Sequence, residues 1–216
     1  TGPVKSSSVS IILIILNLPS ETIGEEMYEL LTMANQTTED VFSLLDNLLK
    51  WTKSQIGKLK VVYQELNMVE VVEGVSEIFT MVAGLKNIKI VQDMPVVPVV
   101  VRADIDMLKT VIRNLISNAI KFSNEGSEVL VSLTEEDGMA IVSVKDSGCG
   151  IDEENQKKLL HTDTHFSTFG TNNEEGSGLG LLLCQDFIVK NGGKLWFTSK
   201  KGEGSTFSFS VPLLEK

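Results

Sequence analysis

Two glycine-rich turns constrain this chain more than any other feature of its sequence. Residues 146–150 read DSGCG, and residues 176–181, about 30 positions further on, read GSGLGL. A helical segment ahead of both turns carries Asn114, Asn118 and Lys121. Each of these three polar clusters has a chemical use for a nucleotide, so their order along one chain predicts that they fold into one binding site.

The composition limits the class of protein. With 216 residues and 42% hydrophobic content, the chain can form one large domain or two small ones with packed cores. Its formal charge of −10 repels phosphate backbones, so we expect no nucleic-acid partner, and a nucleotide site must be built locally from N–H groups, a few cations and a metal ion. Two cysteines, Cys149 and Cys184, form no disulfide framework or zinc cluster, and we interpret them as thiols in a reducing compartment.

The first 57 residues predict a helical hairpin. An apolar segment over residues 4–18 is broken at Pro19, and its run 11–16 is shorter than the roughly 20 residues that span a bilayer. The second helix is expected to end near Ser54. Its apolar stripe recurs at steps of four and three, as in a bundle seam: Met27, Leu31, Ala34, Thr38, Val41, Leu45, Leu48 and Thr52. A homodimeric four-helix bundle would bury this stripe, and packing on the chain's own C-terminal domain is the alternative.

From residue 61 onward the pattern predicts mixed helices and strands. Expected helices cover residues 69–83, 104–122 and 179–191, and expected strands cover 63–67, 88–92, 97–102, 128–135, 139–146, 194–199 and 205–211. We therefore expect an α+β fold, a two-layer sandwich with a mixed, largely antiparallel sheet. The long loop between Ile151 and Gly176 is the anomaly, because loops of that length are usually functional lids.

The helix expected over residues 104–122 carries the first polar cluster. Its predicted buried face consists of Ile105, Leu108, Ile112, Leu115, Ile116 and Ala119. Asn114, Asn118 and Lys121 form a second stripe at spacings of four and three. An amide oxygen is a suitable ligand for Mg²⁺, and an ammonium group one turn away can neutralise a phosphate. The alternative interpretation is an ordinary solvated helix face.

The two turns form the other clusters. An apolar strand delivers Asp146 to its end, where the carboxylate can accept a hydrogen bond from an exocyclic amine such as that of adenine. The second turn opens a helix, whose free N–H groups and dipole favour phosphate oxygens. It is neither a Walker A loop nor a dinucleotide fingerprint, because the required residues and spacing are missing. An ordinary turn after a strand and a flexible hinge are the respective alternatives.

Together the clusters resemble the ATP-binding region of sensor histidine kinases, within the wider group of gyrase, MutL and heat-shock chaperone ATPases. Residues 114–122 (NLISNAIKF) resemble the N box, and the two turns resemble the two glycine boxes. Residues 191–193 with 202–207 resemble the closing hairpin. The resemblance implies a catalytic ATP-binding domain over 60–216 and a dimerisation and histidine-phosphotransfer hairpin over 1–57.

The resemblance also implies residue roles. Asn118 would bind Mg²⁺, Asn114 and Lys121 would act beside the phosphates, and Phe122 would lie by the adenine. Residues from about 152 to 177 would form an ATP lid. The full set of implied ATP-binding residues is Asn114, Asn118, Lys121, Phe122, Asp146, Gly148, Gly150, Ile151, Gly176, Ser177, Gly178, Leu179, Gly180 and Leu181.

Two departures from the family pattern qualify this expectation. The lid segment has Leu159-Leu160 where a phenylalanine often follows the leucine, and it contains no arginine. The chain's two histidines, His161 and His165, lie in the lid segment and not on the hairpin. Because residues 1–4 look like the tail of the acceptor motif, we expect the acceptor histidine to precede residue 1. This stretch alone should then bind ATP without labelling itself.

The leading hypothesis is a cytoplasmic, dimeric histidine kinase that uses Mg²⁺ and ATP and passes its phosphoryl group to a response-regulator receiver domain. Any membrane anchor of the longer protein would lie upstream. One alternative is a non-catalytic, kinase-like module that docks a receiver domain without using ATP. Another is an ATPase of the chaperone or topoisomerase type, which would need a glutamate base where this chain has Asn114, an amide that cannot act as a base.

Overall fold

A computed structural model describes residues 45, 48, 49, 52 and 56 and then the ranges 59–159, 170–171 and 178–214. The chain divides into two compact units, 1–49 and 50–216, and the second holds nearly all of the described residues. The helical hairpin predicted for residues 1–57 lies almost entirely outside the described part of the chain. Of the helices described, none combines the length and the hydrophobicity that a bilayer crossing requires.

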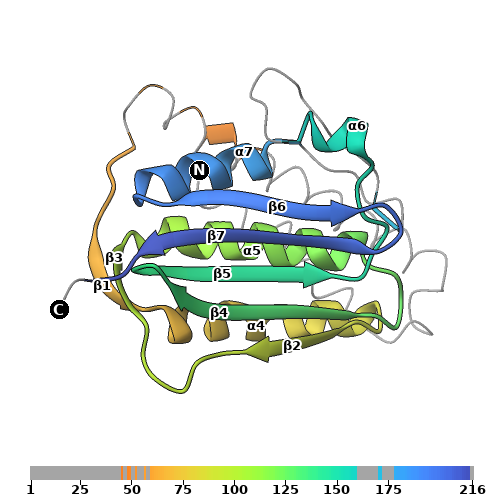
Figure 1. Ribbon diagram of the computed structural model, residues 1–216, viewed down its shortest axis with the longest axis horizontal. Helices are drawn as coiled ribbons and strands as arrows, with labels where there is room; N and C mark the ends of the chain where they lie inside the picture. Colours follow the sequence, from red (N-terminus) through yellow and green to blue (C-terminus); the bar gives the residue numbers. More distant parts are fainter. Residues whose placement is uncertain are drawn as a thin grey trace, which may run out of the picture. The chain divides into compact units, whose positions relative to one another are not determined.

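The second unit is a sandwich of one helical layer and one sheet (Figure 1). Its elements in chain order are β1 (Gln64–Asn67), α4 (Met68–Leu85), β2 (Lys89–Asp93), β3 (Val100–Ala103), α5 (Ile105–Phe122), β4 (Glu128–Glu136), β5 (Met139–Asp146), α6 (Glu153–Gln156), α7 (Gly180–Lys190), β6 (Lys194–Lys200) and β7 (Gly204–Pro212). The five-stranded sheet has the order β2-β4-β5-β7-β6, and β1 pairs with β3 separately. Only the β2–β4 pair in the five-stranded sheet is parallel, so the sheet is mixed, as expected.

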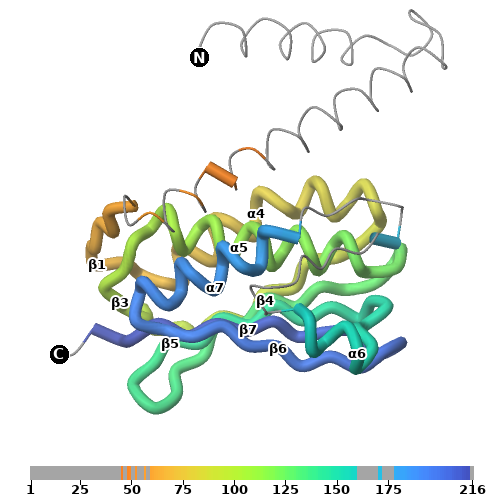
Figure 2. Tube along the Cα trace, turned by 90° about the horizontal axis from the view of Figure 1, so that it is seen from above, coloured from red at the N-terminus to blue at the C-terminus, as the bar shows by residue number. Residues whose placement is uncertain are grey.

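The helices α4, α5 and α7 cover one face of this sheet (Figure 2). Helix α5 begins at Asp104, whose side chain accepts hydrogen bonds from the N–H groups of Asp106 and Met107. Five of the six residues predicted for its apolar face are buried, and Ile105 is half-buried. The core between the layers includes Leu108, Ile112 and Phe209, which have no exposed surface. Burial of this face holds α5 flat against the sheet and orients its polar stripe.

The hairpin between β4 and β5 has the turn that its sequence predicts. Asp137 and Gly138 have φ angles of 50° and 74°. Two successive positive φ values are typical of the tight turns whose twist matches paired strands. The resulting register places Val129 opposite Asp146 and therefore sets the position of Asp146 at the end of β5.

Two local expectations differ from the structure. Strand β3 begins at Val100 instead of residue 97, because Pro98 has no N–H to donate and Val97 is exposed. A short helix, α6, occupies the start of the predicted lid, where Asp152 caps it through the N–H of Asn155. Both cysteines are free: Cys149 is exposed and Cys184 is buried, and burial raises the pKa of the Cys184 thiol.

Candidate functional site

The carboxylate of Asp146 is held in one orientation at the end of β5. Its Oδ1 atom accepts hydrogen bonds from the backbone N–H of Gly148 at 2.9 Å and from that of Ser205 at 3.2 Å. Ser205 lies opposite Asp146 in the β5–β7 register. Only 4% of Asp146 is exposed. Because both bonds end on Oδ1, the other carboxylate oxygen remains for a ligand.

Burial raises the pKa of Asp146, because removal from water disfavours the charged carboxylate. The N–H groups of Gly148 and Ser205 act in the opposite direction by stabilising that charge, but their effect is smaller. A donor supplied by a ligand would stabilise the carboxylate further. A perturbed carboxyl group held in a tight turn is a typical feature of a binding or catalytic site.

The turn 146–150 lies directly against the end of α5. A Cβ atom on Gly148 would lie 2.0 Å from the carbonyl oxygen of Phe122, and the N–H of Cys149 donates to that same oxygen at 3.2 Å. Gly150 has a φ of +59°, and its Cβ would lie 2.0 Å from the carbonyl oxygen of Lys200. Only glycine fits these two contacts. The first glycine turn is thus placed between α5 and the β6–β7 hairpin.

The second glycine turn meets α5 about two helical turns earlier. A Cβ atom on Gly180, the first residue of α7, would lie 2.8 Å from Oδ1 of Asn114. The Nδ2 group of Asn114 donates to the carbonyl of Thr110 at 2.9 Å. Gly178 has a φ of +68°, and Leu179 provides no side-chain cap for α7. The first N–H groups of α7 are therefore of the kind that bind phosphate oxygens.

The remaining polar residues lie on the last turns of α5. Asn118 falls one turn after Asn114 and one turn before Phe122, between the two glycine contacts. It is half-buried, and among the described residues its side chain has no hydrogen-bond partner. The ammonium group of Lys121 lies 5.3 Å from the centre of the Phe122 ring, within range of a cation–π contact.

The structure therefore brings residues of all three predicted clusters to the same part of α5. Gly176 and Ser177 lie outside the described residues, as do His161 and His165. Leu179 is buried, and Leu181 packs against the core, so the side chains of these two residues are not exposed to a ligand. The N–H of Ile151, another predicted site residue, donates a hydrogen bond to Ser199 Oγ at 2.8 Å.

Two residues near Asp146 were not among the sequence-based candidates. They are Ser205, whose N–H donates to the Asp146 carboxylate, and Gly204, where an added Cβ would lie 2.1 Å from the backbone carbonyl oxygen of Asp146. The sequence placed both in the closing hairpin. Nothing in it indicated that this hairpin would pair with residues 139–146.

Residues 103–215 match the family described as histidine kinase-, DNA gyrase B- and HSP90-like ATPases. This match covers more than half of the chain. The chain belongs to this ATPase family. The matched range includes α5, both glycine turns and the closing hairpin, so it contains every predicted site residue.

Relatives of the chain are named as sensory kinases or histidine kinases. The chain is 34% identical over 171 residues to the adaptive-response sensory kinase SasA of Crocosphaera subtropica, covering 79% of this chain and 44% of that kinase. It is 31% identical over 211 residues to the peroxide stress-activated histidine kinase mak2 of Schizosaccharomyces pombe, covering 92% of this chain and 9% of mak2. The chain spans about half the length of its SasA relatives.

Solved structures of histidine kinases share the fold of this ATPase-family chain. The catalytic domain of histidine kinase ThkA is 30% identical, with a TM-score of 0.61 over 70% of this chain and 95% of that domain. Full-length ShkA, crystallised with AMPPNP, is 22% identical, with a TM-score of 0.70 over 88% of this chain and 40% of ShkA. At 22% identity, the similarity to ShkA shows a shared fold only.

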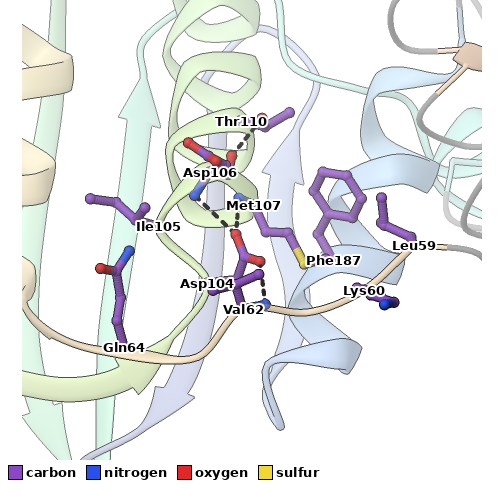
Figure 3. A pocket seen from close by; sticks show the side chains of 10 residues that line it. All are labelled: Leu59, Lys60, Val62, Gln64, Asp104, Ile105, Asp106, Met107, Thr110 and Phe187. Carbon is purple, nitrogen blue, oxygen red and sulfur yellow. Dashed lines mark hydrogen bonds between the residues drawn. The ribbon is translucent and has the colours of Figure 1, made fainter.

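A separate hollow of about 300 Å³ lies at the other end of α5 (Figure 3). The segment before β1 borders it, and there the N–H of Val62 donates to Oδ2 of Asp104 at 2.8 Å. Asp106 also lines this hollow. Helix α5 rises about 1.5 Å per residue, so Asn118 lies roughly 18 Å further along its axis. This hollow is therefore distinct from the site formed by the three clusters.

Proposed function

We propose that this chain binds Mg²⁺ and ATP beside the second half of α5, between the turn 146–150 and the start of α7. One observation carries the proposal: α5 contacts Gly180 through Asn114 and contacts Gly148 through the carbonyl of Phe122. These contacts draw together three polar clusters that are far apart in sequence. The family of the chain and the names of its relatives support ATP as the nucleotide.

At the adenine end, Asp146 would bind the exocyclic amine. The bonds from Gly148 and Ser205 orient its carboxylate through Oδ1, so Oδ2 would accept a hydrogen bond from the amine. The absence of a Cβ on Gly148 keeps the turn against α5 and leaves Phe122 beside it. This arrangement favours adenine over a base with a carbonyl oxygen at the same position.

At the phosphate end, the N–H groups of α7 and the ammonium of Lys121 would bind phosphate oxygens. Asn118 fits Mg²⁺, because its half-buried amide makes no hydrogen bond to another described residue and amide oxygen is a ligand that Mg²⁺ accepts. When bound, Mg²⁺ neutralises charge on the phosphates. In the described ranges no group of three or more His, Cys, Asp or Glu side chains could hold a metal, so the phosphates and water would complete its ligands.

For the longer protein we propose protein-histidine kinase activity. A histidine nitrogen would form a bond to the γ-phosphorus while the bond from that phosphorus to the β–γ bridging oxygen breaks and leaves ADP. The phosphoryl group would then pass to an aspartate of a response regulator, and residues 1–57 would form the homodimer that presents the histidine. ThkA, whose catalytic domain is 30% identical to this chain, has been crystallised with the response regulator TrrA, which supports this partner class.

Calorimetry with two nucleotides tests the ATP site. The unaltered chain should bind Mg·ATP more tightly than Mg·ITP, in which a carbonyl oxygen replaces the exocyclic amine. Asp146→Asn should weaken ATP binding by about tenfold or more and should narrow or reverse the preference over ITP. The asparagine oxygen would keep the bonds from Gly148 and Ser205, so its NH₂ group would face the amine, and two donors cannot bond to each other. Equal binding of ATP and ITP by the unaltered chain would contradict the assignment of Asp146. Failure to bind ADP or ATP at millimolar concentration would favour the non-catalytic docking module.

A further inference from the structure

A lysine from a neighbouring helix reaches the end of α5 that carries Lys121 and Phe122. Lys86 follows the last residue of α4. Its Nζ atom donates to the carbonyl oxygens of Ile120 at 3.1 Å and Lys121 at 2.9 Å, and to Thr171 Oγ1 at 2.6 Å. An ammonium group can donate to several acceptors at once, and these bonds join Lys86 both to the end of α5 and to Thr171.

Thr171 binds the same helix end as Lys86. Its backbone N–H donates to the carbonyl of Lys121 at 3.1 Å, and its hydroxyl lies 2.8 Å from the carbonyl oxygen of Ser123. The hydroxyl can accept from Lys86 and donate to Ser123 at the same time. Thr171 belongs to the segment predicted as the ATP lid. One cluster therefore joins the ends of α4 and α5 to a residue of that segment.

The electrostatics favour this arrangement. The last carbonyl groups of a helix have no partners within the helix and carry its partial negative charge. An ammonium group placed on them is stabilising, and its hydrogen bonds are charge-assisted. The backbone N–H of Ser123 closes the helix with a bond to Ala119. The final turn of α5, which holds Lys121 and Phe122, is therefore held from within the helix and from outside it.

We propose that Lys86 and Thr171 form a clasp that positions the final turn of α5, and with it Lys121, for binding the ATP phosphates. This inference rests on the proposed function. Neither Lys86 nor Thr171 touches the nucleotide in this scheme. They act through the carbonyl groups of Ile120, Lys121 and Ser123, so they are positioning residues.

The first test replaces the clasp lysine. Lys86→Met keeps most of the aliphatic length and removes the charge, and Lys89→Met, at an exposed strand residue three positions on, is the matched control. We expect Lys86→Met to weaken Mg·ATP binding by about tenfold, a size typical of lost charge-assisted contacts, and Lys89→Met to leave it unchanged. Lys86→Arg should recover part of the affinity, because a guanidinium group can donate to the same carbonyls.

The second test uses the threonine. Thr171→Val removes the hydroxyl while keeping the shape, and Thr171→Ser restores the hydroxyl. We expect the valine variant to weaken ATP binding and the serine variant to bind like the unaltered chain. Combining Thr171→Val with Lys86→Met should cost less than the product of the two separate losses, because both changes open the same clasp.

The possible outcomes are distinguishable when binding is measured well below each variant's melting temperature. Weaker ATP binding by Lys86→Met and Thr171→Val, with recovery in Lys86→Arg and Thr171→Ser, supports the clasp. A lowered melting temperature with unchanged ATP affinity makes the cluster purely structural and overturns the positioning role. If the unaltered chain does not bind ATP, the proposed function itself is overturned. If Lys86→Met binds ATP as tightly as the unaltered chain, only the clasp is overturned.

Discussion

Gly148→Ala is the sharpest test of the contact between the first glycine turn and α5. The added methyl carbon would lie 2.0 Å from the carbonyl oxygen of Phe122, 2.7 Å from its carbonyl carbon and 2.9 Å from Oδ1 of Asp146. Two of these atoms belong to backbone and the third to a carboxylate held by two hydrogen bonds. None can swing aside as the tip of a flexible side chain would.

The size of the effect follows from these distances. A carbon and an oxygen that do not hydrogen-bond rarely approach within about 3.2 Å, so the turn must move away from α5 by roughly 1 Å or more. Overpacking of a rigid site costs about 1–3 kcal/mol and occasionally more, and the two backbone contacts place this change at the upper end. For a chain of this size, a loss of about 3 kcal/mol lowers the melting temperature by roughly 6–12 °C.

Thermal denaturation and calorimetry measure the two expected consequences. The melting temperature should fall, and Mg·ATP affinity should fall by at least about tenfold because the adenine turn and Phe122 separate. Gly74→Ala is the matched control: its Cβ meets no atom within 4 Å, and it lies inside α4. Alanine there should stabilise the chain by about 0.5–1 kcal/mol. Unchanged stability and affinity in Gly148→Ala would refute the placement of this turn.

Three further tests probe the site and the helix that carries it. Burial raises the pKa of Asp146, and an adenine amine would favour its charged form, so ATP affinity should fall as the pH drops through that raised pKa. Calorimetry over a series of decreasing pH values should show a smaller fall in affinity for Asp146→Asn. By the same linkage, the Asp146 contribution to stability decreases as pH rises from its ordinary pKa through the raised one. Asn118→Ala should keep its melting temperature and lose the Mg²⁺ dependence of nucleotide binding; retained dependence would exclude Asn118 as a ligand. Asp104→Ala removes the α5 cap and the bond to Val62, so denaturation should show a loss of about 1–2 kcal/mol, against little change in Asp106→Ala.

Local signals in the sequence were sufficient for most of the elements in the second unit. Asp104 before an apolar periodic run predicted the start of α5, and Asp137-Gly138 predicted the β4–β5 turn. These signals act within a few residues, so they can be read without tertiary contacts. The expected strand over 97–102 exists as β3, but its predicted start at residue 97 was wrong, because two prolines, Pro95 and Pro98, interrupt an otherwise strand-like apolar stretch.

The sequence by itself determined the chemical groups of the site: a helix with amide and ammonium groups, a carboxylate after a strand, and glycines where a helix begins. Tertiary structure alone decided how they meet. Strand register places Ser205 on Asp146, helix packing places Gly180 against Asn114, and the folded chain places Lys86 and Thr171 on one helix end. The physical reason is the distance between the partners along the chain: Asp146 and Ser205 are 59 residues apart, and Lys86 and Thr171 are 85 residues apart. Burial of the shared core brings such distant residues together, and no local pattern encodes that.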